Sequence, residues 1–514
     1  MPDLEADFAA ALRRAASTLG APEGLEPVVE PSGQPEAGDL SSPVALRLAR
    51  ELRRPPRAIA EDLAAALRAE GLPHVAAVTV TGPGYVNLRL DDATYGPAVV
   101  TEALAREGQT VLAAEPAGRG KVVVEHTATN PNKAAHVGHL RNACIGDTVA
   151  RLLRARGATV EVQNYIDDTG VQVADVLVGL RHLNLPPPGD GDPFDQYCSR
   201  VYVEICRRYE LEPDLLEERR TTLRAIEARE EPLAGEARRV TGRIVEAHLR
   251  TMARLGIRYD LLTWESDILE LGFWRHAFDL LQESGLLQHP DTGPLSGCWT
   301  LPLSDDEALA DPGDDAAPAE VAAKVLVKSD GVATYTAKDI AYHLWKFGLL
   351  GLDFHYRLLQ PGGPVTSAST PHEDGPAAAS FGRAARVVNV IDQRQAAPQR
   401  MVREALRRLG HVGQARALHH LAYEVVALSP AAARTLWIDT SDGRAMYALS
   451  GRRGIDIGAD ALIDEAEHQV AAKARDRETA HLLAAAAVRY YLLRFGLNAI
   501  ITFDFEEALR TTGD

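Results

Sequence analysis

Apolar residues in the first part of the chain recur with two different spacings. In residues 58–70 they return every three or four positions, which predicts an amphipathic helix. Residues 76–90 instead contain two strand-like runs around Gly82-Pro83-Gly84, a sequence typical of a hairpin turn. Residues 1–112 are therefore predicted to form a small α+β domain, and the Pro-, Gly- and Ala-rich stretch 113–120 is typical of a linker.

After residue 120 the pattern becomes strand, helix, strand. Val122-Val123-Val124 predicts a buried strand, residues 137–156 carry apolar side chains along one helical face, and residues 159–163 predict a second strand. This succession is typical of a βαβ unit in a parallel sheet.

Further parallel-strand signals, at residues 324–327 and 387–391, are separated from that unit by a long and largely helical stretch. We therefore predict a sheet domain formed by residues 118–175 and 322–458, with a mainly helical insertion at 176–321.

Helical spacing resumes after Gly458, so residues 459–514 are predicted to contain two helices, at 461–474 and 478–493. Two helices cannot enclose the core of a helical bundle. Their apolar face is therefore expected to pack on the sheet domain or on a partner, unless the chain is truncated. That face comprises Leu482, Val488, Tyr491 and Leu492.

Length and composition favour a large enzyme. A chain of 514 residues exceeds what one hydrophobic core organises. Its apolar runs are too short to cross a bilayer, so no membrane role is predicted. The N-terminal segment lacks an apolar leader, which favours a cytoplasmic protein. The four cysteines show no CxxC spacing, which argues against structural zinc and against a disulfide framework.

The formal net charge of −17 disfavours nonspecific binding to a nucleic acid backbone, although a local basic groove remains compatible with it. Four arginine pairs are candidates for lining such a groove. For any single pair, a solvated helix face is the commoner explanation. The pairs are Arg219-Arg220, Arg238-Arg239, Arg407-Arg408 and Arg452-Arg453.

The strongest chemical signal is His136-Val137-Gly138-His139, where the first helix of the sheet domain is predicted to begin. Unpaired N–H groups and the helix dipole favour a phosphate there, and Gly138 lets a nucleotide approach the backbone. Two imidazoles on the first turn can donate hydrogen bonds to charge developing on an α-phosphate. Taken alone, the tetrapeptide fits two structural histidines and a helix-entry glycine equally well.

Longer segments in the same order strengthen the nucleotide interpretation. Residues 125–142 read EHTATNPNKAAHVGHLRN, residues 329–346 read SDGVATYTAKDIAYHLWK, and residues 423–430 and 449–454 read YEVVALSP and LSGRRG. They resemble the "HIGH" segment in its archaeal type, the arginine-site segment and the "KMSKS" loop of the arginyl-tRNA synthetases. The GPGYVN sequence at 82–87 resembles the domain that precedes the catalytic core in that family.

The resemblance implies an α/β fold: a class I synthetase Rossmann-like parallel sheet with a helical insertion, an N-terminal α+β domain and a short C-terminal helical segment. It also implies arginine–tRNA ligase activity. ATP, with Mg²⁺, would convert L-arginine to arginyl adenylate, and the arginyl group would pass to tRNA(Arg). No protein nucleophile is expected, because the carboxylate of arginine itself attacks ATP. No bound zinc is expected either, because the cysteines lack ligand spacing.

The same resemblance assigns roles to individual residues. The arginine-binding residues would be Glu125, Asn130, Tyr335, Asp339 and either Gln393 or Gln395. The ATP-binding residues would be His136, Gly138, His139, Val425 and Val426. The catalytic residues would be Lys133, His136, His139, Ser450, Arg452 and Arg453.

The chemistry of arginine fits these residue types. A guanidinium needs carboxylates at its planar edge, and Glu125 and Asp339 supply two. Glu125 lies in an apolar strand, where an unpaired carboxylate is costly, so a functional role is favoured. Asp339 has an alternative, because Thr336 and Asp339 are spaced like a helix N-cap and its N3 partner.

Two departures from the family pattern leave alternatives open. Arg453 stands where the related loop usually has lysine, and members of the family continue for about a hundred residues of helical anticodon-binding domain. One alternative is a paralogue that activates arginine for a non-tRNA or small-molecule acceptor. Another is a catalytically weak tRNA-binding regulatory protein. A simple nucleotidyltransferase explains neither the chain length nor the arginine-site residues.

Overall fold

The computed structural model describes most of the chain in two compact units. Unit 1 comprises residues 1–117 with 155–157, and unit 2 comprises residues 118–154 with 158–514. The described residues are 4–22, 24–32, 36–105, 120–189, 191–302, 323–329, 331, 333–359, 366–372, 381–435, 438–448, 457–471, 474–508 and 510. The predicted linker at 113–120 lies outside them except for Gly120.

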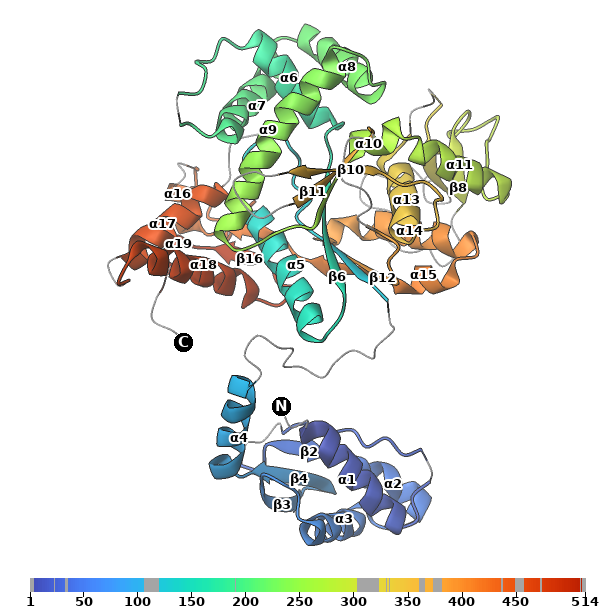
Figure 1. Ribbon diagram of the computed structural model, residues 1–514, viewed down its shortest axis with the longest axis vertical. Coiled ribbons are helices and arrows are strands. Elements are labelled where there is room, and N and C mark those ends of the chain that lie inside the picture. The colour runs from blue at the N-terminus through green and yellow to red at the C-terminus, as the bar shows by residue number, and fades with distance from the viewer. Residues whose placement is uncertain are drawn as a thin grey trace. The chain divides into compact units, whose positions relative to one another are not determined.

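Unit 1 is a four-stranded antiparallel sheet packed with helices (Figure 1). The predicted hairpin is present, and Gly82 at its turn has a φ of 57°, which a side chain disfavours. Its core joins the helices to the sheet. The elements are α1 (Leu4–Thr18), β1 (Glu30–Pro31), β2 (Leu40–Ser42), α2 (Val44–Leu52), α3 (Pro56–Glu70), β3 (Val75–Thr81), β4 (Tyr85–Leu90) and α4 (Asp92–Ala105).

Unit 2 is built on a seven-stranded sheet in the order β10-β11-β7-β6-β5-β12-β13. All neighbouring strands run parallel except β10, which is antiparallel to β11. The carboxyl ends of the central strands therefore share one edge, where ligands of open α/β sheets bind. The strands are β5 (Val122–Glu125), β6 (Val160–Ile166), β7 (Leu261–Trp264), β10 (His355–Leu359), β11 (Thr366–Thr370), β12 (Arg386–Asp392) and β13 (Leu418–Tyr423).

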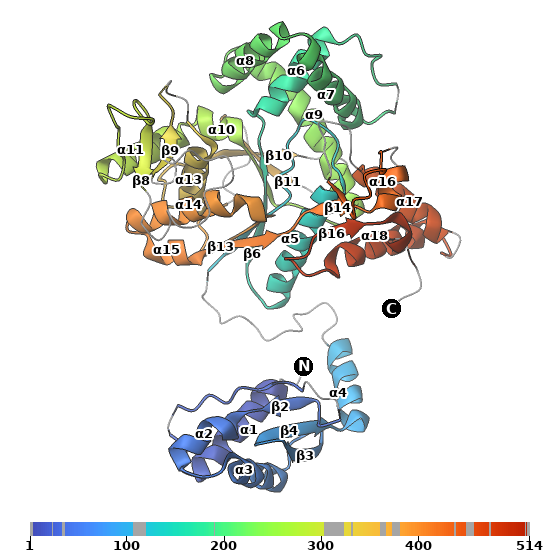
Figure 2. The same cartoon turned by 180° about the vertical axis from the view of Figure 1, so that it is seen from behind.

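Both faces of this sheet are covered, as the unbroken run of valines in β5 predicts. Val122 and Val124 enter one core, whereas Val123 between them enters the other. The first core contains residues of α5 (Val137–Ala155), α9 (Leu233–Arg254), α17 (Ala459–Ala471) and α18 (Arg477–Leu493). The second contains residues of α11 (Phe273–Glu283), α13 (Tyr335–Lys346), α14 (Ala396–Arg408) and α15 (Val412–Ala417), and Figure 2 shows the sheet between the two groups.

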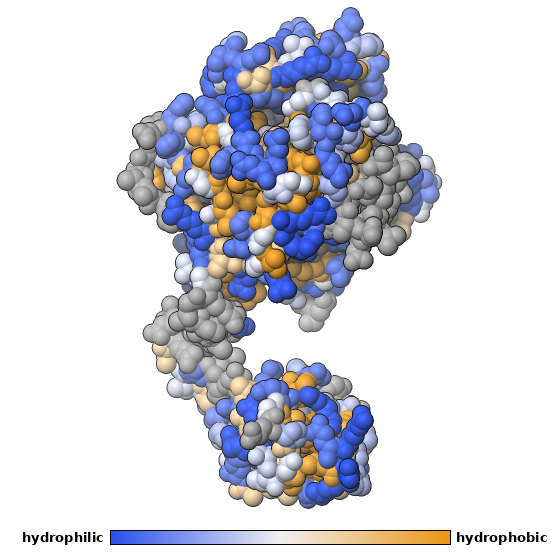
Figure 3. Space-filling view, turned by 90° about the vertical axis from the view of Figure 1, so that its right-hand side faces the viewer, coloured by the Kyte–Doolittle hydropathy of each residue, from blue (hydrophilic) through white to orange (hydrophobic). Residues whose placement is uncertain are grey.

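The insertion between β6 and β7 consists of α6 (Val171–His182), α7 (Phe194–Leu211), α8 (Asp214–Glu227) and α9. Their apolar stripes face one another in small clusters, such as that of Val176, Val201 and Ile244. On the face drawn in Figure 3, hydrophilic residues accordingly predominate over these helices at the top of the molecule. No helix in the described part of the chain is long and apolar enough to cross a membrane.

Two predictions about the strands were wrong. β7 is a central strand of the sheet but lies inside the stretch predicted as a mainly helical insertion at 176–321. Residues 324–327 were assigned to the parallel sheet, yet β9 (Ala323–Val327) forms a separate antiparallel pair with β8 (Trp299–Pro302). Short apolar runs do not reveal their pairing partner, and a four-residue strand cannot be distinguished from a helix by periodicity.

The C-terminal part packs on the sheet rather than standing apart. A small sheet consists of β14 (Val426–Leu428), β15 (Tyr447–Ala448) and β16 (Ile501–Phe503). The helix α16 (Pro430–Thr435) follows β14, and α19 (Phe505–Ala508) follows β16. Elsewhere in unit 2, the short helix α10 (Glu265–Glu270) follows β7. Val488, Tyr491 and Leu492 of α18 are buried in the core that contains α5, as one sequence alternative proposed. Leu482, assigned to the same face, is 62% exposed and does not belong to it.

Candidate active site

The His-x-Gly-His segment forms the start of α5, directly after the loop that follows β5. His136 precedes the helix, and its Nδ1 accepts a hydrogen bond from the Gly138 N–H at 3.1 Å. The Nδ1 of His139 accepts from the His136 N–H, also at 3.1 Å, and the two rings stack with centroids 3.7 Å apart. With Nδ1 accepting, the proton of each neutral ring resides on Nε2.

Electrostatics keep His139 neutral. Burial lowers the pKa of His139 well below its usual range, and the neighbouring His136 adds a smaller effect in the same direction. A neutral imidazole with its proton on Nε2 remains a hydrogen-bond donor without adding a buried charge. The Nε2–H of His139 is therefore a donor that an anion can use throughout the neutral pH range.

Buried amides hold the loop between β5 and α5 in an unusual backbone conformation. Thr127 and Ala128 have φ values of 77° and 40°. The Thr127 N–H donates to Asn142 Oδ1 at 2.5 Å, and the Ala128 N–H donates to Asn164 Oδ1 at 2.9 Å. Sequence reasoning gave neither asparagine a role. Each stands among other polar residues of α5 or β6, so the sequence carried no signal that would single it out.

A cavity of about 460 Å³ brings five of the predicted residues together: Asn130, Lys133, His136, His139 and Gln395. Gln172 and Tyr202 of the helical insertion line it as well, so the insertion forms one wall. The other lining residues are Thr127, Ala128, Asn132, Asn142, Ile391, Asp392 and Tyr423.

Gln393 and Gln395 are distinguished by their positions. Both lie in the 3₁₀ turn η1 (Gln393–Gln395) after β12, which Asp392 caps by accepting from the Arg394 N–H at 2.9 Å. Gln395 is half-buried and lines the cavity, whereas Gln393 is exposed and does not.

A second polar cluster lies at the end of β5, around Glu125. Its Oε1 pairs with Lys346 Nζ at 2.9 Å, and the side chain of Lys346 is fully buried. The ammonium also donates to Asn389 Oδ1 at 3.2 Å and lies 4.4 Å from the ring centroid of Tyr342. The second oxygen, Oε2, is buried and has no hydrogen-bond partner among the described residues. Such a carboxylate oxygen is costly unless a ligand fills its place.

Asp339 adds a second carboxyl group to this cluster. Burial, which is the main cause, and the charge of Glu125 together raise the pKa of Asp339 to about 7, whereas Lys346 opposes the shift. The helix-cap alternative is wrong, because α13 begins at Tyr335 with Thr334 as N-cap residue, and Thr336 Oγ1 has no partner among the described residues. When both carboxyl groups are ionised, the cluster holds two negative charges against the one positive charge of Lys346, so one more cation would balance it.

Tyr335, at the first position of α13, is 57% exposed, and the Lys324 ammonium lies 5.6 Å from its ring centroid. The residue does not line the cavity, nor do Glu125, Asp339 and Gly138. The predicted residues therefore fall into a cavity group and a Glu125 group, joined by the short chain segment from Glu125 to Asn130.

A buried network anchors α13 to the sheet, and the sequence gave no indication of it. Lys338 Nζ donates to Glu265 Oε1 at 2.6 Å, and Tyr165 and Thr169 also donate to that carboxylate. Burial alone would raise the pKa of Glu265, but the Lys338 ammonium lowers it below its ordinary value. The helix that carries Asp339 is thus held by an ion pair one residue away.

Val426 is the first residue of β14 and Val425 directly precedes it, and neither lines the cavity. The fully buried Arg141 of α5 connects them to the motif helix, since its guanidinium donates to the carbonyls of Glu424, Val425, Gly496 and Ala499. Ser450, Arg452 and Arg453 lie outside the described residues. No group of three or more His, Cys, Asp or Glu side chains suited to a metal occurs in the part that the structure describes.

The other arginine pairs do not form one groove. Arg407 and Arg408 both pair with Glu404, and Arg220 pairs with Glu217. Arg238 is half-buried and pairs with the buried Asp168 and Asp267. Its neighbour Arg239 is exposed.

Two family models match this chain. The model described as "Arginyl tRNA synthetase N terminal domain" matches residues 3–90, and that described as "tRNA synthetases class I (R), catalytic domain" matches residues 99–348.

Curated relatives and solved structures agree with these models. The chain is 36% identical to the arginine–tRNA ligase of Thermus thermophilus, covering 98% of this chain and 78% of the relative. It is 34% identical to that of Thermococcus sibiricus, covering 93% and 74%. The solved Thermus thermophilus arginyl-tRNA synthetase superposes with a TM-score of 0.75 at 34% identity, covering 99% of this chain and 79% of that one. The Plasmodium falciparum arginyl-tRNA synthetase, at 14% identity and a TM-score of 0.65, shares the fold.

Proposed function

The chain belongs to the arginyl-tRNA synthetase family, and from that premise we propose that it activates L-arginine with ATP and transfers the arginyl group to tRNA(Arg). One observation carries the choice of amino acid. Oε2 of Glu125 is buried without a partner among the described residues, in a cluster that holds the carboxyl group of Asp339 as well. A guanidinium supplies the missing donors and the missing positive charge.

In the proposed arginine site, Glu125 and Asp339 bind the guanidinium, and Tyr335 covers it from the start of α13. Lys346 already occupies Oε1 of Glu125, so Oε2 is the oxygen left for substrate. Asn130 and Gln395 are proposed to hold the α-amino end, because both line the cavity into which the segment from Glu125 leads. We prefer Gln395 to Gln393, which is exposed.

In the proposed reaction, an oxygen of the arginine carboxylate attacks the α-phosphorus of ATP, and the bond to the bridging oxygen of pyrophosphate breaks. The two imidazoles, each through its Nε2–H, and Lys133 would stabilise the negative charge on phosphate. A 2′- or 3′-hydroxyl of the terminal ribose of tRNA then attacks the carbonyl carbon, and AMP leaves.

Three further assignments remain proposals from the family pattern. Val425 and Val426 would lie beside the adenine, and Ser450, Arg452 and Arg453 would contribute to phosphate binding from their loop. Mg²⁺ would enter with ATP. Among the residues that line the cavity, Asp392 is the single carboxylate, which fits a Mg²⁺ ion held mainly by phosphate oxygens rather than a protein-built metal centre.

The test is ATP–pyrophosphate exchange with each standard amino acid, with and without tRNA, followed by charging of tRNA. We expect exchange with arginine and with no other standard amino acid, and we expect arginyl-tRNA to form. Exchange with another amino acid would contradict the assignment of the Glu125 cluster. Arginine-dependent exchange without any charging would favour an acceptor other than tRNA.

A further inference from the structure

The loop after β5 concentrates polar atoms that are buried but unsatisfied. Residues 125–132 contain four side-chain atoms that have no hydrogen-bond partner among the described residues. They are Glu125 Oε2, His126 Nε2, Thr129 Oγ1 and Asn132 Nδ2. Of these four residues, Asn132 alone lines the cavity of about 460 Å³ that contains the two motif histidines. The sequence gave Asn132 no role.

The side chain of Asn132 presents a donor that lacks an acceptor. The residue is 1% exposed, and its backbone N–H donates to the carbonyl oxygen of Asn130 at 2.9 Å. A buried amide N–H without an acceptor is costly, so such groups are almost always satisfied by protein atoms, by water or by a ligand. Because Asn132 borders the cavity, we expect the acceptor to belong to a molecule bound there.

Contacts from the helical insertion hold the residues that follow Asn132. His248 of α9 lies 2.7 Å, through Nε2, from the carbonyl oxygen of Lys133. Ser199 of α7 accepts a hydrogen bond from the Ala134 N–H at 2.9 Å. The backbone directly after Asn132 is thus bound on two successive residues.

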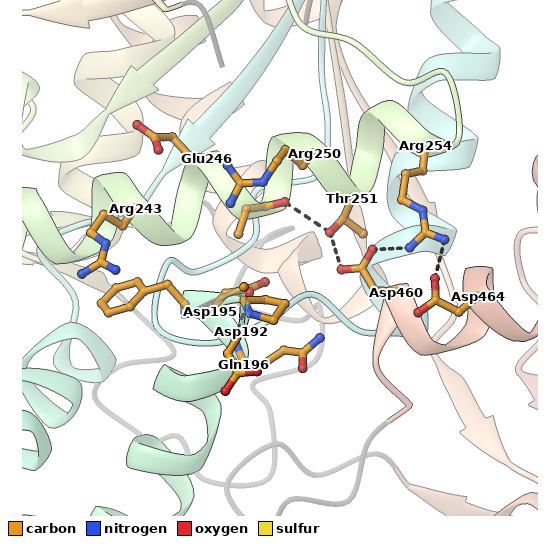
Figure 4. Close-up of a pocket in the computed structure, with 14 residues that line it drawn as sticks. Asp192, Asp195, Gln196, Arg243, Glu246, Arg250, Thr251, Arg254, Asp460 and Asp464 are labelled. Atoms are coloured by element: carbon orange, nitrogen blue, oxygen red, sulfur yellow. Dashed lines mark hydrogen bonds and ion pairs between the residues drawn. The ribbon is translucent and has the colours of Figure 1, made fainter. Parts of the chain in front are cut away.

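The helix that carries His248 is itself anchored to the C-terminal part of unit 2. Thr251, three residues after His248, donates to Asp460 of α17 at 2.7 Å, and Arg254 pairs with the same carboxylate at 2.8 Å (Figure 4). The end of the loop is therefore fixed by packed helices, and a donor that is fixed beforehand loses little entropy when a ligand binds.

The chemistry of the reactants decides which atom Asn132 can meet. An amide N–H only donates, and the α-ammonium group of arginine also only donates, so the two do not pair. The acceptors that arginine and ATP bring are the oxygen atoms of the carboxylate and of the phosphates. Asn130 is proposed to hold the α-amino group, whereas Lys133, His136 and His139 are proposed to contact phosphate. In arginyl adenylate the carboxyl carbon lies between those two groups, as Asn132 lies between the two sets of residues.

We infer that Asn132 Nδ2 donates a hydrogen bond to one oxygen of the arginine carboxylate, the oxygen that becomes the carbonyl oxygen of arginyl adenylate. This inference rests on the proposed function and adds a substrate-binding residue to it. The contact leaves the other carboxylate oxygen to attack the α-phosphorus, so it selects the attacking oxygen as well as binding the substrate.

The same hydrogen bond serves the transfer step. The hydroxyl oxygen of the terminal ribose forms a bond to the carbonyl carbon and releases its proton to water, while the electron pair of the C=O bond moves onto the carbonyl oxygen. The double bond then re-forms as the bond to the AMP oxygen breaks. A donor on the carbonyl oxygen stabilises the charge that develops there, so loss of Asn132 should slow transfer as well as weaken arginine binding.

The test uses Asn132→Ala and Asn132→Asp, with Asn498→Ala as a control at an exposed asparagine. In ATP–pyrophosphate exchange with tRNA present, Asn132→Ala should raise KM for arginine about tenfold to a hundredfold, because a hydrogen bond to a charged group is lost. Asn132→Asp should raise it further, since its carboxylate repels that of arginine. KM for ATP should change little, and the control should keep every value. The rate constant of transfer from preformed arginyl adenylate should fall about tenfold to a hundredfold in Asn132→Ala.

Agmatine, which is arginine without its carboxyl group, identifies the atom that is bound. It keeps the guanidinium and the amino group, so its inhibition constant in the exchange reaction should be the same for the unmodified protein and for Asn132→Ala. Equal rises in KM for arginine and in the inhibition constant of agmatine would overturn the inference, as would a rise confined to KM for ATP or tighter arginine binding by Asn132→Asp.

Melting curves separate substrate binding from a role in the fold. Without ligand, Asn132→Ala should melt no lower than the unmodified protein, because it removes a buried donor that has no acceptor. A lower melting temperature or a failure to fold would overturn the inference. If the unmodified protein catalyses arginine-dependent exchange and Asn132→Ala keeps its KM, the inference is overturned while the proposed function stands. If the unmodified protein catalyses none, the proposed function fails, and equal stabilisation of both proteins by arginine then overturns the inference as well.

Discussion

Replacing Asp339 by asparagine should weaken arginine binding and stabilise the fold at the same time. The substitution keeps the size of a half-buried side chain but removes a carboxyl group whose pKa burial raises to about 7. If that group binds a guanidinium, its loss removes a charge-assisted hydrogen bond worth about 1.5–3 kcal/mol. KM for arginine should therefore rise about tenfold to a hundredfold, while KM for ATP changes little.

The stability effect follows from the same pKa. The carboxyl group is harder to ionise in the folded protein than in the unfolded chain, whose ordinary value is 3.8. The folded state thus keeps the proton between about pH 4 and pH 7, and its stability falls as pH rises through that window. Each pH unit corresponds to about 1.4 kcal/mol, so ionisation costs at most about 4 kcal/mol above pH 7.

Asparagine removes this cost, so urea unfolding at pH 8 should give the variant a larger free energy of unfolding than the unmodified protein, and the gap should vanish near pH 4. Steady-state exchange kinetics measure the two KM values on the same preparations. Equal increases in KM for arginine and for ATP, or a loss of stability at pH 8, would show that the carboxyl group serves the fold and would refute this reasoning.

Other substitutions separate positioning from catalysis. Lys346→Met leaves the carboxylate of Glu125 uncompensated and should lower the free energy of unfolding by about 3–5 kcal/mol; adding Glu125→Gln should recover part of the loss in urea titrations, and strictly additive losses would exclude the ion pair. His139→Ala should lower kcat of exchange about 10²–10³-fold with little change in KM for ATP, and a change in KM alone would contradict a role in the transition state. Gly146→Ala places a Cβ 2.3 Å from the His126 side chain and should lower the free energy of unfolding by about 1–3 kcal/mol. Gly242→Ala is the control, because its Cβ meets nothing within 4 Å, and it should not lower the melting temperature. Equal melting temperatures of the two variants would refute the predicted clash.

Sequence reasoning succeeded where a local pattern determines a local structure. The start of α5 follows from a buried strand, a polar loop and an apolar helical face, all within about thirty-five residues of chain. Glu125 was singled out because a carboxylate at the end of an apolar strand needs a partner, and the structure supplies Lys346 for one oxygen and leaves the other without one among the described residues.

The partners themselves could not be found in this way. Lys346 lies at the end of an amphipathic helix, where a lysine normally faces solvent, and its burial depends on Glu125, which is distant in sequence. Asn164 likewise acts on the backbone of another segment. The position of β7 was missed for the same reason, because strand order is a property of pairing between distant segments.

The guanidinium of Arg141 gives unit 2 a particular kind of cooperativity. One buried side chain on the motif helix holds carbonyl groups from the chain before β14 and from the turn before β16. Opening either segment would leave a cation in the interior with too few acceptors, so local unfolding there is expected to spread to the start of α5. The segments before β14 and β16 and the histidine segment should therefore exchange their amide protons as one unit, and a substitution that loosens one should loosen the others.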